Sequence, residues 1–157
     1  MHDPTTVGQS EPAQSFLLLV IDDDLIQRTI IAKLGTQAGF DVTAAATFDE
    51  AAGLLTKHKF DCVTLDLSLG EQSGILLLRS IVDSGHRMPV IVISGAEPHV
   101  LQSTVAMAQS LNLDSLPLSK PLNLTELRGA LAKKRQSAPA LRLIMQLAES
   151  APQIVSA

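Results

Sequence analysis

Five residues with chemically useful side chains stand at the ends of short apolar runs, far apart along the chain. They are, in chain order, Asp22, Asp23, Asp66, Ser94 and Lys120. Each alone has an ordinary structural explanation, because such residues commonly cap helices or form turns. Together, carboxylates, a hydroxyl and an ammonium group form a set that can bind a cation and handle a phosphoryl group.

The three carboxylates could not share one site without a compensating charge. Two unit charges about 4 Å apart repel by about 4 kcal/mol at an effective dielectric constant of about 20. A hard divalent cation removes this cost, and carboxylates with phosphate are the ligands that Mg²⁺ prefers. With a metal bound, a carboxylate can attack a phosphoryl group and form an acyl phosphate. The lysine and the metal would neutralise charge on the transferred oxygens.

The apolar pattern predicts the elements that position these groups. Continuous apolar runs, such as residues 16–21 and 90–93, are typical of parallel strands covered on both faces. Strand-like and helix-like segments alternate five times, which predicts a parallel sheet between helices, with ligands at the carboxyl ends of the strands. We expect strands at 16–21, 41–46, 61–65, 90–93 and 116–118, and helices at 26–38, 47–57, 75–83, 98–111 and 123–135.

Local signals mark several helix ends. Asp24 is expected to cap the first helix, and Thr47 with Glu50 forms a capping box. Gly39 stands where a C-terminal glycine cap belongs. The first helix is expected to have an apolar stripe of Ile26, Ile30, Leu34 and Ala38.

Composition excludes several classes of protein. The chain has 157 residues, a formal net charge of −4 and one cysteine, Cys62. It therefore has neither a disulfide framework nor a cysteine zinc cluster, and its charge argues against direct nucleic-acid binding. The run 16–21 is too short to cross a bilayer, and no positively charged segment precedes it. The sequence thus predicts a cytoplasmic protein without a membrane segment.

Three regions are predicted along the chain: a flexible tail at 1–15, one domain at 16–135, and an extension at 136–157 with an extra helix. That helix, about 140–149, has an apolar face of Leu141, Ile144, Met145 and Ala148. Two alternatives remain open. The face packs on its own domain, or it pairs with a second copy of the chain or joins an output domain.

Residues 16–134 resemble a response-regulator receiver domain. The resemblance rests on the order and spacing of five motifs: Val20-Ile21-Asp22-Asp23-Asp24, Leu65-Asp66-Leu67, Gly74, Val92-Ile93-Ser94-Gly95 and Lys120-Pro121. It implies a doubly wound α/β fold of the flavodoxin-like, CheY-like kind. Five parallel strands in the order 2-1-3-4-5 would lie between two helix layers.

The resemblance also implies a chemistry. Asp66 would accept a phosphoryl group from a histidine kinase or a phosphotransfer protein. Mg²⁺ would be held by Asp23, Asp66 and the backbone carbonyl of Ser68, and by Asp22 through water. Such a module catalyses only its own phosphorylation and dephosphorylation, so it is not an enzyme for a separate substrate.

Ser94 and Lys120 would sense the phosphoryl group, and the bond between Lys120 and Pro121 is commonly cis in such domains. Two positions depart from the family pattern. Gly70 stands where a proline is frequent, and Pro117 replaces the Tyr or Phe that usually swings inward to report the phosphorylated state. The usual aromatic switch is therefore absent.

Two further hypotheses remain. Asp22-x-Asp24 also resembles the haloacid-dehalogenase phosphatase pattern, with Asp22 as nucleophile and Asp24 as acid/base. The third is a degenerate receiver that acts only as an interaction module. The position of the acyl phosphate, on Asp66 or on Asp22, discriminates the first two.

Overall fold

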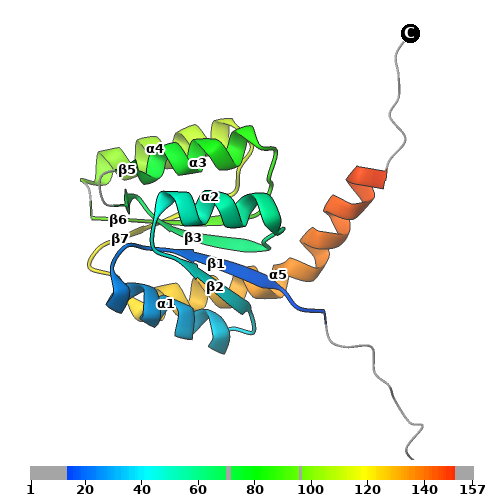
Figure 1. Ribbon diagram of the computed structural model, residues 1–157, viewed down its shortest axis with the longest axis horizontal. Helices are drawn as coiled ribbons and strands as arrows, with labels where there is room; N and C mark the ends of the chain where they lie inside the picture. The colour runs from blue at the N-terminus through cyan, green and yellow to red at the C-terminus, as the bar shows by residue number, and fades with distance from the viewer. Residues whose placement is uncertain (1–13, 70–71, 96, 151–157) are drawn as a thin grey trace, which may run out of the picture.

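Five parallel strands form the central sheet of the computed structural model, which describes residues 14–69, 72–95 and 97–150. Their order is β2-β1-β3-β6-β7 (Figure 1), which is 2-1-3-4-5 when the sheet strands are counted along the chain. The predicted fold class and strand order are confirmed. The strands are β1 (Leu17–Ile21), β2 (Asp41–Ala45), β3 (Cys62–Asp66), β6 (Val90–Ser94) and β7 (Ser115–Ser119).

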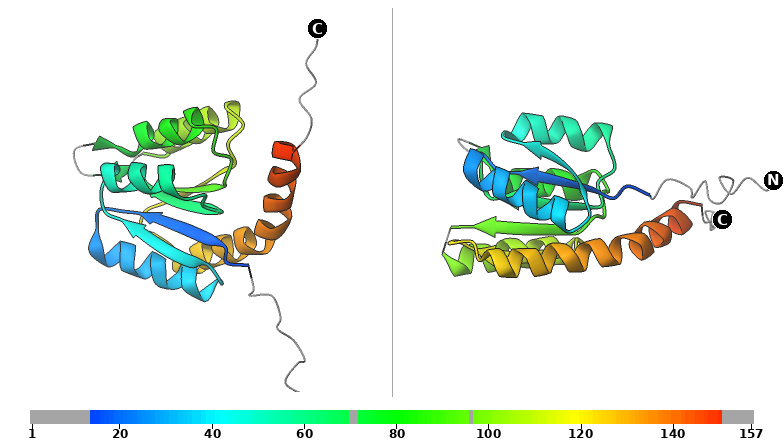
Figure 2. Two further views of the ribbon diagram at one scale, coloured as in Figure 1. Left: turned by 45° about the vertical axis from the view of Figure 1, so that its right-hand side comes forward. Right: turned by 90° about the horizontal axis from the view of Figure 1, so that it is seen from below.

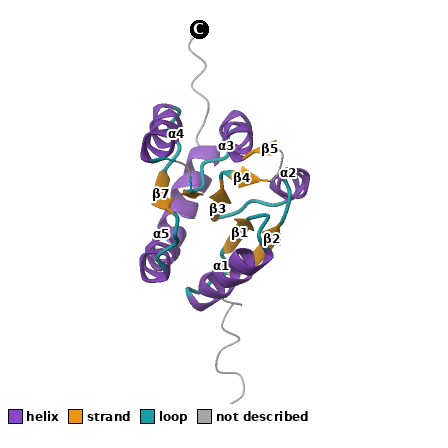
Figure 3. Cartoon of the chain, turned by 90° about the vertical axis from the view of Figure 1, so that its left-hand side faces the viewer, coloured by secondary structure: helices purple, strands orange, loops and turns teal. Residues whose placement is uncertain are grey.

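Helices cover both faces of this sheet. Viewed along the strands, α1 and α5 lie on one face and α2, α3 and α4 on the other (Figure 3). Each side has its own buried aliphatic cluster. The helices are α1 (Leu25–Gln37), α2 (Phe48–Lys57), α3 (Gly74–Asp83), α4 (Pro98–Ser110) and α5 (Leu124–Ser150).

Strand β1 shows why its apolar run is continuous. Leu18 and Val20 belong to the cluster beneath α1 and α5. Leu19 and Ile21 belong to the cluster beneath α2, α3 and α4. All four are at most 1% exposed. Because successive strand residues point to opposite faces, a strand covered on both faces needs an apolar residue at every position.

The predicted helix caps are present. The Asp24 side chain accepts hydrogen bonds from the backbone N–H groups of Ile26 and Gln27, at 2.9 and 3.0 Å. Thr47 accepts one from the Glu50 N–H at 3.1 Å. Gly39 has φ +101°, the left-handed conformation that ends a helix.

The apolar stripe predicted for α1 is partly wrong. Ile26 and Ile30 are 73% and 37% exposed, whereas the buried face consists of Ile31, Leu34 and Gly35. A Cβ at Gly35 would lie 2.4 Å from Leu18 Cδ2. The helix therefore approaches β1 closely through Gly35, and this contact turns Ile26 and Ile30 outward.

Helix α5 runs without a break from Leu124 to Ser150, with Pro139 inside it. The prediction of a separate helix after Pro139 is therefore wrong. Proline lacks the N–H that would bond to the carbonyl of Arg135, which weakens the helix at that turn. The second half of α5 curves beside the amino ends of the strands (Figure 2).

An ion pair holds the second half of α5 against this amino edge. The Arg142 guanidinium donates to both carboxylate oxygens of Asp61, at 3.1 and 2.5 Å, and to the Ser15 carbonyl at 2.8 Å. Asp61, just before β3, also accepts the Leu17 N–H at 2.7 Å. The ion pair thus links α5 to β1 and to the start of β3.

Cation–π contacts reinforce this junction. The guanidinium groups of Arg135 and Arg142 lie 4.3 and 4.1 Å from the centre of the Phe16 ring. Phe16 itself is 4% exposed. A guanidinium group over the face of an aromatic ring is attracted by the negative charge of that face, so both contacts help to hold α5 against the residues that precede β1.

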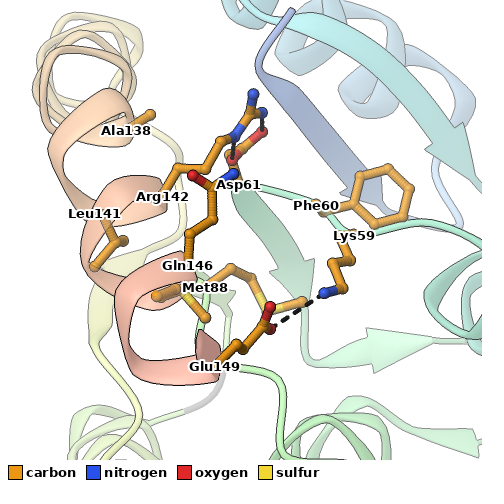
Figure 4. A pocket seen from close by; sticks show the side chains of 10 residues that line it. Lys59, Phe60, Asp61, Met88, Ala138, Leu141, Arg142, Gln146 and Glu149 are labelled. Carbon is orange, nitrogen blue, oxygen red and sulfur yellow. Dashed lines mark hydrogen bonds and ion pairs between the residues drawn. The ribbon is translucent and has the colours of Figure 1, made fainter. Parts of the chain in front are cut away.

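A cavity of about 330 Å³ lies between the second half of α5 and the domain (Figure 4). Leu141 and Met145 line it from α5, opposite Phe60 and Met88. Leu141 and Met145 of the predicted apolar face thus face the domain across this cavity, whereas Ile144 is 62% exposed. Packing of this face on its own domain remains a prediction.

No helix in the described ranges combines the length and the apolar character needed to cross a membrane. The predicted boundaries at residues 15 and 135 remain predictions. Residues 1–13 of the predicted tail, and 151–157 of the predicted extension, lie outside the described ranges.

Arg142→Ala should lower the free energy of unfolding by about 1–3 kcal/mol, because it leaves the poorly exposed Asp61 carboxylate without its charged partner. Lys59→Ala is the matched control. Lys59 pairs with Glu149 at 3.2 Å, but both side chains are largely exposed, so its loss should change stability by no more than about 0.5 kcal/mol. Urea denaturation of the full chain measures both. Equal effects would contradict the proposed weight of the Arg142 ion pair.

Candidate functional site

Three aspartates converge at the carboxyl ends of two neighbouring strands. β1 and β3 pair in parallel, with Ile21 opposite Leu65, so the residues that follow them come together. One carboxylate oxygen from each of Asp22, Asp23 and Asp66 lies within 4.8 Å of the others. The predicted convergence of carboxylates is confirmed.

Asp66 is the most fully engaged of these residues. Its side chain is 1% exposed, and Lys120 Nζ donates to its Oδ2 at 2.7 Å. Its Oδ1 accepts the backbone N–H of Ser68 at 2.9 Å. Lys120 comes directly after β7, and its own N–H donates to the Ser94 carbonyl at 2.9 Å. The sheet therefore brings Lys120 to Asp66 across an intervening strand.

Asp22 is fully buried. Its Oδ1 accepts the N–H of Asp24 at 2.9 Å, and Arg28 donates to its backbone carbonyl at 2.8 Å. Burial raises the pKa of Asp22, and the nearby Asp66 carboxylate raises it further. Hydrogen bonds from Gln27 and Asp24, and the charge of Lys120, act in the opposite direction.

Gln27 is the site residue that the sequence analysis missed. Its side-chain Nε2 donates to Asp22 Oδ2 and, at 3.2 Å, to Asp66 Oδ2. The spacing from Asp24 to Gln27 matches a capping box, in which the fourth residue turns back over the helix start. That spacing was the available signal, although here the amide turns to the carboxylates.

Ser94 ends β6 and is 1% exposed. The backbone of the same strand end receives Leu67, whose N–H donates to the Ile93 carbonyl at 2.9 Å. Ser94 thus lies at the same carboxyl edge as Asp66, as predicted. Its hydroxyl is buried among the strands that carry the acidic cluster.

The loop after Asp66 has a small ladder that the sequence did not predict. β4 (Ser68–Leu69) pairs antiparallel with β5 (Gln72–Ser73). Gly70, one of the two departures from the family pattern, lies outside the described residues. The ladder brings the chain back so that the Gly74 N–H donates to the Leu67 carbonyl at 2.9 Å.

Gly74 allows this return. A Cβ at Gly74 would lie 2.6 Å from Leu67 Cα and 2.7 Å from the Asp66 carbonyl oxygen. Neither backbone atom can move without displacing the end of β3. The glycine eight residues after Asp66 therefore has a packing reason that is independent of any resemblance.

Pro117 lies on the edge strand β7, opposite Val92, and is exposed. Its position on the edge is as expected, because proline cannot donate to a second neighbouring strand. No aromatic side chain occupies this position. The Lys120–Pro121 peptide bond is cis, as predicted.

The donor set consists of carboxylate oxygens held close together. Such a set fits a hard cation such as Mg²⁺ better than zinc, whose structural sites use sulfur and nitrogen ligands. The close approach of Asp22, Asp23 and Asp66 also needs a positive charge to offset it. The cluster can therefore hold a metal ion.

Comparison with known proteins agrees with this geometry. The sequence model of the response regulator receiver domain matches residues 18–132. The chain therefore belongs to the response regulator receiver family. Members of this family are phosphoacceptor modules rather than enzymes with a separate substrate, and a histidine kinase is the partner that the family implies.

Two curated relatives are much longer than this chain. Regulatory protein VirG from Agrobacterium fabrum is 34% identical over 106 residues, which cover 68% of this chain and 40% of VirG. The sensor histidine kinase RcsC from Salmonella typhi is 28% identical over 129 residues, which cover 82% of this chain and 13% of RcsC. The chain thus spans less than half the length of either relative.

Solved receiver structures share the fold. A signal receiver domain from Vibrio parahaemolyticus has a TM-score of 0.72 at 18% identity, covering 83% of this chain and 98% of that one. A response regulator from Burkholderia pseudomallei, crystallised with a phosphorylated aspartic acid, a calcium ion and citrate, has a TM-score of 0.61 at 27% identity. The match covers 83% of this chain and 75% of that one.

Gly74→Ala should lower the free energy of unfolding by about 1–3 kcal/mol, because the added methyl group overlaps backbone atoms. Gly129→Ala in α5 is the matched control. A Cβ there meets nothing within 4 Å, so this change should stabilise the helix by about 0.5–1 kcal/mol. Urea denaturation should show the opposite signs. A Gly74→Ala protein as stable as the wild type would contradict this close packing.

Proposed function

We propose that this receiver domain accepts a phosphoryl group on Asp66. The observation that carries the proposal is the placement of the buried Asp66 carboxylate between Lys120 and the other two aspartates. Lys120 offsets its negative charge and can stabilise the developing charge on a transferred phosphoryl group. In the transfer, an Asp66 oxygen forms a bond to phosphorus while the bond from phosphorus to the donor breaks, and the donor keeps the electron pair.

The proposed metal is Mg²⁺, held by Asp23, Asp66 and the Ser68 carbonyl, with Asp22 acting through water. Mg²⁺ bound here would supply positive charge to the phosphoryl oxygens. The burial of Asp22 and its contact with the backbone support this outer role, because its Oδ1 already accepts the Asp24 N–H at 2.9 Å. Asp23 is exposed at the mouth of the cluster, where a hydrated cation can reach it.

Ser94 and Lys120 are the proposed sensors of the phosphoryl group. Both are placed at the carboxyl edge by adjacent strands, and the Lys120 N–H bonds to the Ser94 carbonyl. A movement of either backbone segment therefore affects the other. Because Pro117 has no swinging side chain, we propose that the signal leaves through the backbone between Ser94 and α4.

A phosphatase with Asp22 as nucleophile is less well supported. Asp22 is fully buried, and Asp24 is occupied with the N–H groups that begin α1. An acid/base residue must reach the leaving group or the attacking water. A purely degenerate receiver is likewise disfavoured, since no acidic residue, lysine or serine of the expected set is missing.

The proposed phosphoryl donor is a histidine kinase or a histidine phosphotransfer protein. The phosphorylated aspartic acid in the Burkholderia pseudomallei relative supports the acceptor role. The similarity to a segment of a sensor histidine kinase supports the class of partner. A cytoplasmic location and pairing with a second copy of the chain remain predictions from the sequence.

Asp66→Asn should abolish incorporation of phosphate from acetyl phosphate with Mg²⁺, because the nucleophilic carboxylate is lost. Asp24→Asn is the matched control and should retain most of the incorporation, since Asn also caps helices well. Intact-protein mass spectrometry at neutral pH, followed by acid treatment, measures the labile adduct. An adduct that persists in the Asp66→Asn protein would move the nucleophile to another residue and favour the phosphatase hypothesis.

Mg²⁺ should raise the melting temperature at neutral pH and lose this effect as the pH falls. A ligand at about 100 times its dissociation constant stabilises a protein by about 2.7 kcal/mol. Because the pKa of Asp22 is raised, its carboxylate binds a proton more readily in the folded state than in the unfolded state. Protonation relieves the metal-free protein of carboxylate repulsion and competes with the cation, so both effects shrink the Mg²⁺ increment in acid.

Differential scanning fluorimetry from about pH 7 to about pH 4.5, with Na⁺ at matched ionic strength as the control, measures this increment. An increment that is absent at neutral pH, or that grows in acid, would count against the proposed metal site.

A further inference from the structure

We propose that the side-chain amide of Gln27 competes with the divalent cation for Asp22 and Asp66, and so lowers the metal affinity of the site. The inference rests on the proposed Mg²⁺ site and goes beyond it. It assigns a role to a residue on α1 that is neither a proposed ligand nor a proposed phosphoacceptor.

The contacts place the amide where positive charge is needed. Gln27 Nε2 donates to one oxygen of Asp22 and, at 3.2 Å, to Oδ2 of Asp66. Both neighbours are carboxylates that only accept hydrogen bonds. The nitrogen, rather than the oxygen, of the amide must therefore face them when no cation is bound.

The charges around this position make the amide a partial substitute for a cation. Lys120 Nζ contacts the same Asp66 oxygen at 2.7 Å. Arg28 donates its hydrogen bond to the backbone carbonyl of Asp22, at 2.8 Å, and not to the Asp22 carboxylate. The Gln27 amide is thus the side-chain donor that bridges Asp22 and Asp66 among the hydrogen bonds of the described residues.

A cation that binds these carboxylates must displace the amide. Mg²⁺ requires near-ideal octahedral geometry with oxygen ligands and keeps several water molecules. The Gln27 nitrogen, which contacts both carboxylates, therefore occupies space that the ion and its water molecules need. Gln27 lies in the first turn of α1 and is only half-buried. Its side chain can therefore turn toward solvent without unfolding the helix.

The competition has a consequence for signalling. In the metal-free protein, Gln27 and Lys120 together hold Asp66 in place. Loading of the cation, and with it readiness to accept a phosphoryl group, then requires breaking the two hydrogen bonds of Gln27. A side chain without a donor at this position should load the cation at lower concentration.

Isothermal titration with MgCl₂ tests the proposal on the full chain. Gln27→Met keeps the length of the side chain and its helix propensity but removes the donor. It should tighten Mg²⁺ binding by about 10- to 150-fold, as expected for hydrogen bonds to charged groups that no longer have to be broken. Gln37→Met, the same change at the exposed last residue of α1, is the matched control and should leave the affinity unchanged.

A second measurement separates competition from a general effect on folding. Metal-free Gln27→Met should melt at a lower temperature than the wild type, while its Mg²⁺-induced increment should be larger. Gln27→Ala should behave in the same direction, which covers the case in which methionine packs poorly.

The other possible outcomes contradict either the competition by Gln27 or the Mg²⁺ site itself. Equal affinities of wild type and Gln27→Met would overturn the competition and leave the metal site standing. Weaker binding by Gln27→Met would show that the amide assists the cation through its oxygen, which also overturns the competition. If neither the wild type nor Gln27→Met shows Mg²⁺ binding, the proposed Mg²⁺ site itself is overturned.

Discussion

The spacing of parallel strands, about 4.8 Å between neighbours, forces the carboxylates that follow β1 and β3 into one another's range. Asp22 and Asp66 cannot separate, because the two strands are hydrogen-bonded in register up to Ile21 and Leu65. Several surrounding groups donate hydrogen bonds to these carboxylates and so offset their repulsion. Lys120 approaches from β7, the Ser68 N–H from the following loop, and the Gln27 amide from α1. The aliphatic clusters on both faces keep the strands from relaxing apart.

The sequence predicted most of this arrangement because its strongest signals are local. A strand covered on both faces must be apolar at every position, so β1 and β6 stand out without any tertiary information. The polar residues that end these strands must then lie at one edge of the sheet, because parallel strands have their carboxyl ends at the same edge. The sequence alone therefore predicts that Asp22, Asp66, Ser94 and Lys120 lie together.

The features that escaped prediction depend on contacts between distant segments. Proline normally predicts the end of a helix, yet α5 continues past Pro139, where Arg142 pairs with Asp61 from the opposite part of the chain. The buried face of α1 is set by the close approach of Gly35 to Leu18, not by the spacing of its isoleucines. Gln27 has the composition of an ordinary helix residue, and only the folded chain shows that its amide faces two carboxylates.

The two ends of the described chain leave from the side of the sheet opposite to the acidic cluster. The start of β1 and the last turns of α5 lie near the amino ends of the strands (Figure 1). Asp22, Asp23 and Asp66 follow the carboxyl ends of the strands. The described residues therefore begin and end on the side of the sheet away from the acidic cluster. Similar segments make up 40% of VirG and 13% of RcsC. With both ends of the described fold on the far side of the sheet, further chain can be joined at either end without its first residues covering the acidic cluster.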